Sequence, residues 1–261
     1  MKPVLIITGG SSGIGRATAQ LFASKGWTVY ELSRHQRELG AGVVHFSCDV
    51  TDEANCRSVV EAIMQRETRV DVLISNAGFG ISGPVEFTET EEAKRLFDVN
   101  FFGALNITKA VLPFMRAQKG GRILYTSSVA APLSVPYQSF YSASKAALNA
   151  MALALQNEVR PFGIRVGCLL PGDVQTGFTD AREKSMRGSD VYTRAEKAVS
   201  AMEKDERNGM KPEQMARLFY RMATRRYLPV YTVGGGLYRL FCFLDKLLPK
   251  TLVNKIEGLL Y

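Results

Sequence analysis

The chain of 261 residues, with a mass of 28.8 kDa, has the length of one large α/β domain. Apolar residues make up 46% of it and charged residues 22%, which excludes a disordered or fibrous chain. Its net charge of +8 comes from dispersed Lys and Arg residues. We therefore expect a solvated surface or an attraction for anionic cofactors, and no nucleic-acid partner.

Cysteine and histidine are scarce and scattered. The four cysteines form no CxxC pair, which argues against a zinc site or a disulfide framework. The two histidines, His35 and His45, both fall early, so we expect neither a Ser-His-Asp hydrolase nor a metal site. No apolar run reaches the roughly 18 residues of a transmembrane helix. The N-terminus enters a strand-like run at once, without room for a secretory signal, so we expect a cytoplasmic protein.

Short β-branched apolar runs alternate with helix-length segments, as in a parallel sheet that is covered by helices on both faces. Because crossovers between parallel strands are right-handed, this alternation predicts a single-domain, Rossmann-like α/β fold with a doubly wound sheet over residues 1–261. We predict strands at 4–8, 28–33, 43–47, 70–75, 121–126 and 164–170, and helices at 14–25, 52–66, 90–101, 102–116 and 139–160.

The first predicted strand runs through a glycine-rich turn into the first predicted helix. Glycine is needed where φ is positive and where the backbone must approach a pyrophosphate without an intervening Cβ. The free N–H groups and the dipole of the following helix would point at the phosphates. A plain tight turn is the alternative, but we predict dinucleotide binding at Thr8, Gly9, Ser11, Ser12, Gly13, Ile14 and Gly15.

The second predicted strand ends at Ser33, and Arg34 follows it. An NAD-selective site has an acidic residue here, about 20 residues after the glycine turn, to bind the ribose hydroxyl. A small neutral residue followed by a guanidinium suits the 2′-phosphate of NADP(H) instead. Glu31 shares this side of the strand but should lie too far back to reach the ribose. We therefore predict NADP(H) in preference to NAD(H), with an exposed turn arginine as the alternative.

Several motifs follow one another along residues 3 to about 180: Thr-Gly-x-x-x-Gly-x-Gly, Asp49-Val50, Asn76-Ala77-Gly78, Asn100, Ser128, Tyr141-x-x-x-Lys145 and Pro171-Gly172-x-x-x-Thr176. In these motifs the sequence resembles the short-chain dehydrogenase/reductase family. The resemblance implies a nicotinamide cofactor, with Asp49 bonding the adenine amino group and Thr176 contacting the nicotinamide amide. It also implies a cofactor site lined by Val50, Asn76, Ala77, Gly78, Tyr141, Lys145, Pro171, Gly172 and Val174.

Tyr141 and Lys145 are four residues apart in a predicted helix, so their side chains project from the same face. Tyrosine alone is a poor acid–base group at neutral pH, because its pKa is about 10. A neighbouring ammonium should lower that pKa, and Lys145 can also hold the nicotinamide ribose. Ser128 lies 13 residues before Tyr141, where its hydroxyl could stabilise an oxyanion on the substrate. Ser127 is a rival that only the family spacing disfavours.

By resemblance, Asn100 completes the catalytic set by holding a water that links Lys145 to solvent, although from the sequence alone it could equally mark a helix kink. The expected reaction transfers hydride from NADPH to a carbonyl carbon, and Tyr141 donates a proton to the carbonyl oxygen. The surroundings are mainly apolar, which suits a hydrophobic, steroid-like or lipid-like ketone more than a sugar. The predicted substrate residues are Ser128, Ala130, Gln138 and Tyr141.

Two segments follow the recognisable motifs. Residues about 173–212 are polar and weakly helical and follow the end of a predicted strand, so we expect a substrate lid there. Residues about 227–261 form an apolar, aromatic extension that resembles the tails of reductases acting on steroids or lipids. Three interpretations of this extension stay open: a helix packed on its own domain, a subunit contact, or peripheral docking on a membrane.

The predicted helix 139–160 carries several alanines and an apolar stripe, which let another helix approach closely. Family resemblance implies that it pairs across a two-fold axis, so we predict a homodimer or homotetramer. A non-catalytic NADP-binding regulator or scaffold is the alternative function, and a 3-oxoacyl thioester reductase is less favoured. A sugar-nucleotide epimerase would need more than the 90 residues that follow Pro171.

Overall fold

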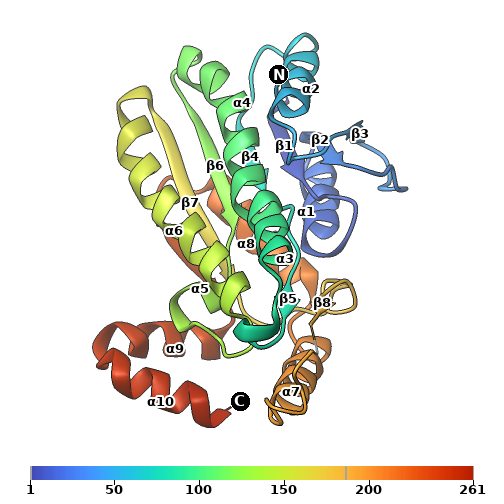
Figure 1. Cartoon of the computed structure of the whole chain (residues 1–261). Helices are drawn as coiled ribbons and strands as arrows, with labels where there is room; N and C mark the ends of the chain where they lie inside the picture. Colours follow the sequence, from blue (N-terminus) through green and yellow to red (C-terminus); the bar gives the residue numbers. More distant parts are fainter. Residues whose placement is uncertain (1, 186, 261) are drawn as a thin grey trace.

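A computed structural model describes residues 2–185 and 187–260, with side chains through residue 258. A seven-stranded parallel sheet runs through the molecule in the order β3-β2-β1-β4-β6-β7-β9 (Figure 1). The order reverses between β1 and β4, so the predicted Rossmann-like, doubly wound fold is confirmed. The strands are β1 Val4–Thr8, β2 Thr28–Ser33, β3 Val43–Ser47, β4 Val72–Ser75, β6 Gly121–Thr126, β7 Ile164–Pro171 and β9 Tyr231–Gly234.

Helices cover both faces of the sheet (Figure 1). Val4 and Ile6 of β1 face the layer of α2, α4 and α6, whereas Leu5 and Ile7 face α1 and α8. Burial on both sides explains why the central strands are continuous apolar runs without alternation. The helices are α1 Gly13–Ser24, α2 Glu53–Met64, α3 Thr90–Phe97, α4 Gly103–Ala117, α5 Ala130–Leu133, α6 Ser139–Val159, α7 Ala195–Arg207, α8 Pro212–Thr224, α9 Gly236–Leu247 and α10 Lys250–Leu260, with 3-10 turns at Val85–Phe87 and Arg160–Phe162.

Apart from shifts of one or two residues at several element ends, three differences from the sequence prediction stand out. The helices predicted at 90–101 and 102–116 follow one continuous path, because a π-helical turn, Asp98–Phe102, joins α3 to α4. β4 begins two residues later than predicted, since Asp71 turns its carboxylate onto the backbone amide of Val4 at 2.8 Å. β9 was not predicted at all: it has only four residues and lies within the extension interpreted as one apolar tail.

Smaller elements cluster beyond the carboxyl ends of the strands (Figure 1). β5 Ile81–Ser82 pairs with β8 Glu183–Lys184, which connects the chain after β4 to the predicted lid. With β8 and α7, the segment 173–212 is more ordered than its sequence predicted. The α9–α10 hairpin lies beside α5 at the same end of the molecule (Figure 1). Within the described part of the chain, every helix is too short or too polar to cross a membrane.

Candidate active site

The carboxyl ends of four central strands meet at one edge of the sheet, and the predicted motifs follow them there. Thr8 ends β1, Ser75 ends β4, Thr126 ends β6 and Pro171 ends β7. In open α/β sheets, ligands bind outside this edge where the strand order reverses. Motifs spread over most of the sequence are therefore assembled into one candidate site.

The turn between β1 and α1 has the backbone of a phosphate cradle. Gly9 and Gly13 have positive φ angles of 64° and 51°. A Cβ on Gly15 would lie 2.2 Å from the Gly9 carbonyl oxygen, so only glycine lets α1 begin this close to the strand. Ser12 is the N-cap residue, and its exposed hydroxyl makes no capping bond. The turn fits a pyrophosphate at the start of α1. The predicted turn residues all lie here: Thr8, Gly9, Ser11, Ser12, Gly13, Ile14 and Gly15.

Asn76 braces the strand ends with its side chain. Its Nδ2 donates to the carbonyl oxygens of Thr8 and Gly9 at 3.2 and 3.1 Å. Its Oδ1 accepts a hydrogen bond from Thr126 Oγ1 at 3.0 Å. Thr8 Oγ1 in turn accepts from the backbone amides of Asn76 and Ala77. The ends of β1, β4 and β6 are thus tied together, and the backbone of Ala77 and Gly78 remains for the predicted wall of the cofactor site.

The end of β2 lies directly beside the glycine turn, because the Gly9 amide donates to the Leu32 carbonyl at 2.8 Å. Ser33 follows half-buried, and Arg34 is exposed. Arg16, in the first turn of α1, donates through Nη2 to the carbonyl of Glu38 in the loop after Arg34 at 3.2 Å. Sequence analysis did not single out Arg16, although its place just after the glycine turn was a usable signal. We call the region around Ser33, with Arg34 and Arg16, the basic corner.

Glu31 is directed into the protein and away from this corner. Its side chain is fully buried, and a Cβ on Gly10 would lie 2.5 Å from its Cγ. Its Oε2 lies 2.7 Å from Nδ1 of His45 on β3. One oxygen of the carboxylate is thus engaged beneath the glycine turn, and Ser33 is the half-buried residue that ends β2.

The residues after β3 are divided between the corner and the core. Hydrogen bonds from the amide and hydroxyl of Thr51, and then the charge of Arg34, hold the pKa of Asp49 below its ordinary value. Asp49 is therefore a carboxylate near the basic corner. The side chains of Val50 and Val174 pack in the two hydrophobic cores. Only the main-chain atoms of these two residues remain for the cofactor contact that was predicted.

The predicted catalytic residues converge at the start of α6. Lys145 Nζ lies 5.7 Å from the centroid of the Tyr141 ring, on the same face of the helix. The Ser128 hydroxyl lies close enough to the Tyr141 phenol to lower the pKa of that phenol. Ser127 is buried, and its hydroxyl reaches the carbonyl of Lys145 at 3.4 Å instead. Of the two serines, the structure places Ser128 at the phenol.

Burial dominates the titration of both side chains on α6. It raises the pKa of Tyr141 to about 12, against a smaller lowering by the hydrogen bond from Ser128. It lowers the pKa of Lys145 to about 8, and Lys145 Nζ donates to the Thr126 carbonyl at 2.9 Å. The expected lowering of the Tyr141 pKa by Lys145 is not found: burial raises this pKa, and the lowering contributions come from Ser128 and Arg182. Tyr141 is a protonated phenol at neutral pH, the form that can donate a proton.

Asn100 lies at a helix irregularity and close to Lys145, and its predicted role of holding a water stays a prediction. It lies in the π-helical turn, so it does mark an irregularity in the helix. Its side chain is buried, accepts from the Phe79 amide at 3.0 Å and donates to the Phe79 carbonyl at 3.0 Å and to Ser144 Oγ at 3.1 Å. A Cβ on Gly78 would lie 2.8 Å from Asn100 Oδ1 and 3.4 Å from Lys145 Nζ. Asn100 therefore borders the lysine that it was predicted to serve.

The sequence model of the short chain dehydrogenases matches residues 3–187. The chain belongs to this family, and it is an oxidoreductase. It is 38% identical to a protein named 3-ketodihydrosphingosine reductase from Bacteroides thetaiotaomicron, over 100% of this chain and 99% of the relative. Among solved structures, a short-chain dehydrogenase from Streptomyces avermitilis is 30% identical with a TM-score of 0.85, covering 99% of this chain and 97% of its own. A family member from Burkholderia phymatum, in complex with NAD, is 28% identical with a TM-score of 0.80 and coverages of 94% and 95%.

The segment 173–212 of this short-chain dehydrogenase lies over Tyr141, the predicted proton donor. The Phe178 ring is 5.7 Å from the Tyr141 ring, and the Arg182 guanidinium lies 5.7 Å from the Phe178 ring. Arg182 forms an ion pair with Glu206 of α7, which also accepts from Thr179 Oγ1 at 2.7 Å. Sequence analysis missed these residues, because the ion pair joins positions 24 apart in a segment without a periodic pattern.

The other predicted substrate residues lie beneath this segment. Gln138 is buried, and its Nε2 contacts the Met202 sulfur of α7 at 3.0 Å. Ala130 is buried at the start of α5, where its amide donates to Ser128 Oγ at 3.1 Å. The Ser128 oxygen is therefore oriented by the backbone, and its O–H is directed toward the Tyr141 phenol.

The chain after β7 is held against both the cofactor turn and the C-terminal hairpin. A Cβ on Gly13 would lie 3.2 Å from the Thr176 Cβ, so Thr176 borders the phosphate cradle. A Cβ on Gly172 would collide with the Tyr238 ring of α9 at 2.1 Å. Tyr238 also hydrogen-bonds Asp173. The start of the predicted lid is thus held against the glycine turn on one side and against α9 on the other.

Proposed function

We propose that this short-chain dehydrogenase is an NADP(H)-dependent reductase of a hydrophobic ketone or aldehyde. The convergence of Ser128, Tyr141 and Lys145 beside the glycine turn carries the proposal. Similarity over the full length to a 3-ketodihydrosphingosine reductase favours a long-chain 3-keto amino alcohol as the first substrate to test. A non-catalytic regulator is the alternative, but it gives the three converging side chains no role.

The roles of the residues follow from the geometry. The glycine turn would hold the pyrophosphate, with Lys145 and Thr176 at the nicotinamide end. The bound cofactor supplies a hydride to the carbonyl carbon. Tyr141 donates its phenolic proton to the carbonyl oxygen, and Ser128 donates a hydrogen bond to the same oxygen. Hydride on carbon and proton on oxygen give the alcohol, and the Lys145 ammonium stabilises the tyrosinate that is left.

The basic corner supports NADP(H). Arg34 and Arg16 bring two guanidinium groups to the loop beside Ser33. A 2′-phosphate gains charge-assisted hydrogen bonds from such groups, which a ribose hydroxyl does not match. Glu31, the acidic residue of the strand, is engaged by His45 and does not compete.

The segment 173–212, which we propose as the substrate lid, supports a substrate with a polar group beside its carbonyl. The Arg182 side chain is 1% exposed, and its Nη1 has no hydrogen-bond partner among the described residues. A buried donor without an acceptor is costly, so a hydroxyl oxygen of the substrate would stabilise it. Phe178, which contacts both Arg182 and Tyr141, gives this space an apolar side.

A substrate panel tests the proposed function. NADPH oxidation is measured with a long-chain 3-keto amino alcohol, a plain ketone of equal chain length and a 3-oxoacyl thioester, and then with NADH in place of NADPH. We expect the highest kcat/KM for the amino alcohol with NADPH. Tight NADPH binding without turnover of any carbonyl compound would instead support the regulator.

Replacing the proton donor separates chemistry from binding. Tyr141→Phe removes the phenolic proton, so we expect kcat to fall by roughly 10²–10⁴-fold while NADPH affinity is nearly unchanged. The measurement is steady-state turnover beside NADPH fluorescence titration. Phe79→Tyr is the matched control, because it alters an aromatic ring near the site without touching the donor. A Tyr141→Phe enzyme with most of its turnover would overturn the assignment.

A further inference from the structure

Helix α9, the first helix of the C-terminal hairpin, has its apolar side turned to solvent. Leu240, Phe243 and Leu247 are 50%, 58% and 64% exposed, and they lie three and four residues apart on one stripe. The opposite side of the helix holds Cys242 and Asp245, which are buried. A helix packed only on its own domain has the reverse arrangement, so this face is built to be covered.

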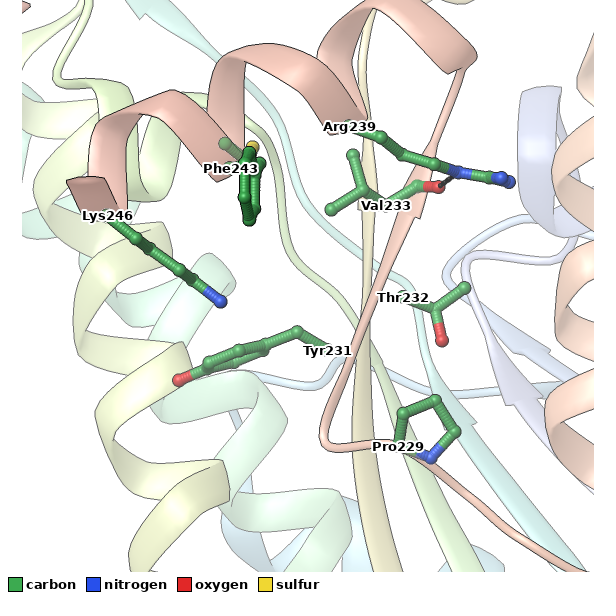
Figure 2. A pocket seen from close by; sticks show the side chains of 8 residues that line it. Pro229, Tyr231, Thr232, Val233, Arg239, Phe243 and Lys246 are labelled. Atoms are coloured by element: carbon green, nitrogen blue, oxygen red, sulfur yellow. Dashed lines mark hydrogen bonds between the residues drawn. The ribbon is translucent and has the colours of Figure 1, made fainter. Parts of the chain in front are cut away.

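Further apolar side chains of the hairpin are also exposed. Leu237 of α9 and Leu252 and Ile256 of α10 are 59%, 45% and 45% exposed. Phe243 and Lys246 also line a groove of about 340 Å³ between β9 and α9, with Tyr231 on its far wall (Figure 2). We call the exposed apolar side chains of α9 and α10 the outer face of the hairpin.

The charges around the outer face are of one sign. The two acidic side chains of the hairpin are not fully exposed to solvent. Asp245 is buried and pairs with Lys250, and Glu257 is half-buried. The exposed charged side chains of residues 236–258 are all basic: Arg239, Lys246, Lys250 and Lys255. An apolar face rimmed by cations matches the surface of a bilayer that contains anionic lipid. A second copy of the chain would bring an equal set of cations against it.

The hairpin that carries the outer face contacts segments on both sides of the candidate active site. Lys250 Nζ reaches the carbonyl of Pro132 in α5 at 3.4 Å, a few residues after Ser128. Arg194, just before α7, donates to the carbonyl of Gly258 in α10 at 3.3 Å. Figure 1 shows α5, α7, α9 and α10 together beyond the carboxyl ends of the strands. A membrane on this face would thus adjoin the predicted lid.

We propose that the outer face of α9 and α10 docks the enzyme on the surface of a bilayer that contains anionic phospholipid, with the entrance to the active site turned toward the lipid. The helices lie flat in the interface and do not cross it. Binding is reversible, because it depends on a limited apolar area and on a few cations.

Vesicle flotation tests the docking. The wild-type protein should float with vesicles of phosphatidylcholine and phosphatidylglycerol, and less with phosphatidylcholine alone. The triple variant Leu240→Ser, Phe243→Ser, Leu247→Ser should lose about tenfold or more of its partition coefficient, since interfacial binding scales with buried apolar area. The matched control Tyr227→Ser, at a 78% exposed aromatic before β9, should float like wild type.

Charge variants and a solution measurement complete the test. Lys246→Gln and Lys255→Gln should each weaken binding to the anionic vesicles about fivefold, with little effect on neutral vesicles. Absence of wild-type flotation would overturn the proposal. So would a triple variant that floats normally, or one whose only change is a smaller oligomer in sedimentation without vesicles, which would assign the face to a second copy.

Docking and the reductase activity can fail separately. Flotation needs no substrate, so it is measured whether or not any carbonyl compound is turned over. Turnover of a short, water-soluble ketone and the circular dichroism spectrum should be the same in the triple variant and in wild type, because the three side chains are exposed. A loss of the spectrum would move the test to Lys246→Gln and Lys255→Gln, whose unchanged binding would overturn the docking.

Discussion

Lys145 is an ammonium enclosed by protein, and its proton is coupled to folding. It is 3% exposed, and burial lowers its pKa from 10.5 to about 8. Between these two values the unfolded chain holds the proton and the folded chain does not. Stability therefore increases with pH across this window, and the charged form below it opposes folding. The enzyme would keep this cost because the cation is needed beside Tyr141.

A pH series on a charge-free variant isolates this coupling. Relative to Lys145→Met, the free energy of unfolding of the wild type should rise between pH 8 and 10.5, by at most about 1.4 kcal/mol per pH unit. Urea unfolding of both proteins at several pH values measures it. Taking the difference removes the titration of other groups that the two proteins share. A difference that stays flat across the window would show that Lys145 titrates normally.

At the scale of single residues, we also expect Ser33 and Arg34 to determine the preference for NADPH over NADH. Ser33→Asp with Arg34→Ala replaces the guanidinium that we propose binds a 2′-phosphate with a carboxylate that repels it. We expect the ratio of kcat/KM for NADPH over NADH to fall by about tenfold or more. Lys25→Ala, which removes an exposed cation at the other end of α1, is the control and should leave the ratio unchanged. A wild-type preference for NADH would contradict the interpretation of this strand end.

At the scale of elements, the two parts of the site differ in how they are held. The cofactor side is built on strand ends that Asn76 ties together. The substrate side depends on the predicted lid, whose ion pair between Arg182 and Glu206 is mostly enclosed. Removing one partner of such a pair leaves a buried charge, which is more disruptive than removing both.

This difference predicts an asymmetric response in the lid. Glu206→Gln should speed hydrogen exchange in residues 178–207 and raise KM, because Arg182 loses its counter-charge, while exchange in the central strands stays slow. The double variant Arg182→Met, Glu206→Leu should recover much of the protection, since it removes both charges together. Hydrogen exchange read by mass spectrometry, with steady-state kinetics, measures both effects. Unchanged exchange in Glu206→Gln would mean that the pair does not hold the lid.

Local patterns in the sequence predicted most of this architecture and fewer of its contacts. Apolar runs located six strands, and glycine spacing located the phosphate cradle, because each is dictated within a few residues. β9 escaped prediction because four residues carry no pattern of their own and pair with β7 across some 60 positions. The brace by Asn76 and the stacking of Phe178 on Tyr141 are likewise long-range contacts. They follow from the folded topology, which no local segment encodes.

On the scale of the whole molecule, one side of the α4–α6 layer remains uncovered. Phe102 and Leu153 are 47% and 44% exposed there, and Ala143, Ala146 and Ala150 of α6 are exposed between them. Small residues let a second helix approach closely. We propose that this layer pairs two copies of the chain, as the sequence predicted.

An arginine at the centre of that layer tests the pairing. Leu153→Arg places a cation where two copies would meet, so we expect a shift from dimer or tetramer to a monomer of 28.8 kDa in sedimentation velocity. Val44→Arg is the matched control: Val44 is 39% exposed, on the edge strand β3. A wild-type protein that is already monomeric at micromolar concentration would refute the predicted assembly. The cytoplasmic location expected from the sequence also stays a prediction.

The path of the chain after β7 carries a consequence for the order of events in one catalytic cycle. Thr176 lies against Gly13 of the phosphate cradle, and Phe178, two residues further on, lies on the Tyr141 ring. We therefore expect the same short stretch to cover the bound cofactor first and the carbonyl compound second. We expect a compulsory sequence in which the dinucleotide enters before the carbonyl compound and leaves after the alcohol. Opening of this segment, and not the transfer of the proton, should then be the rate-limiting step of each turnover.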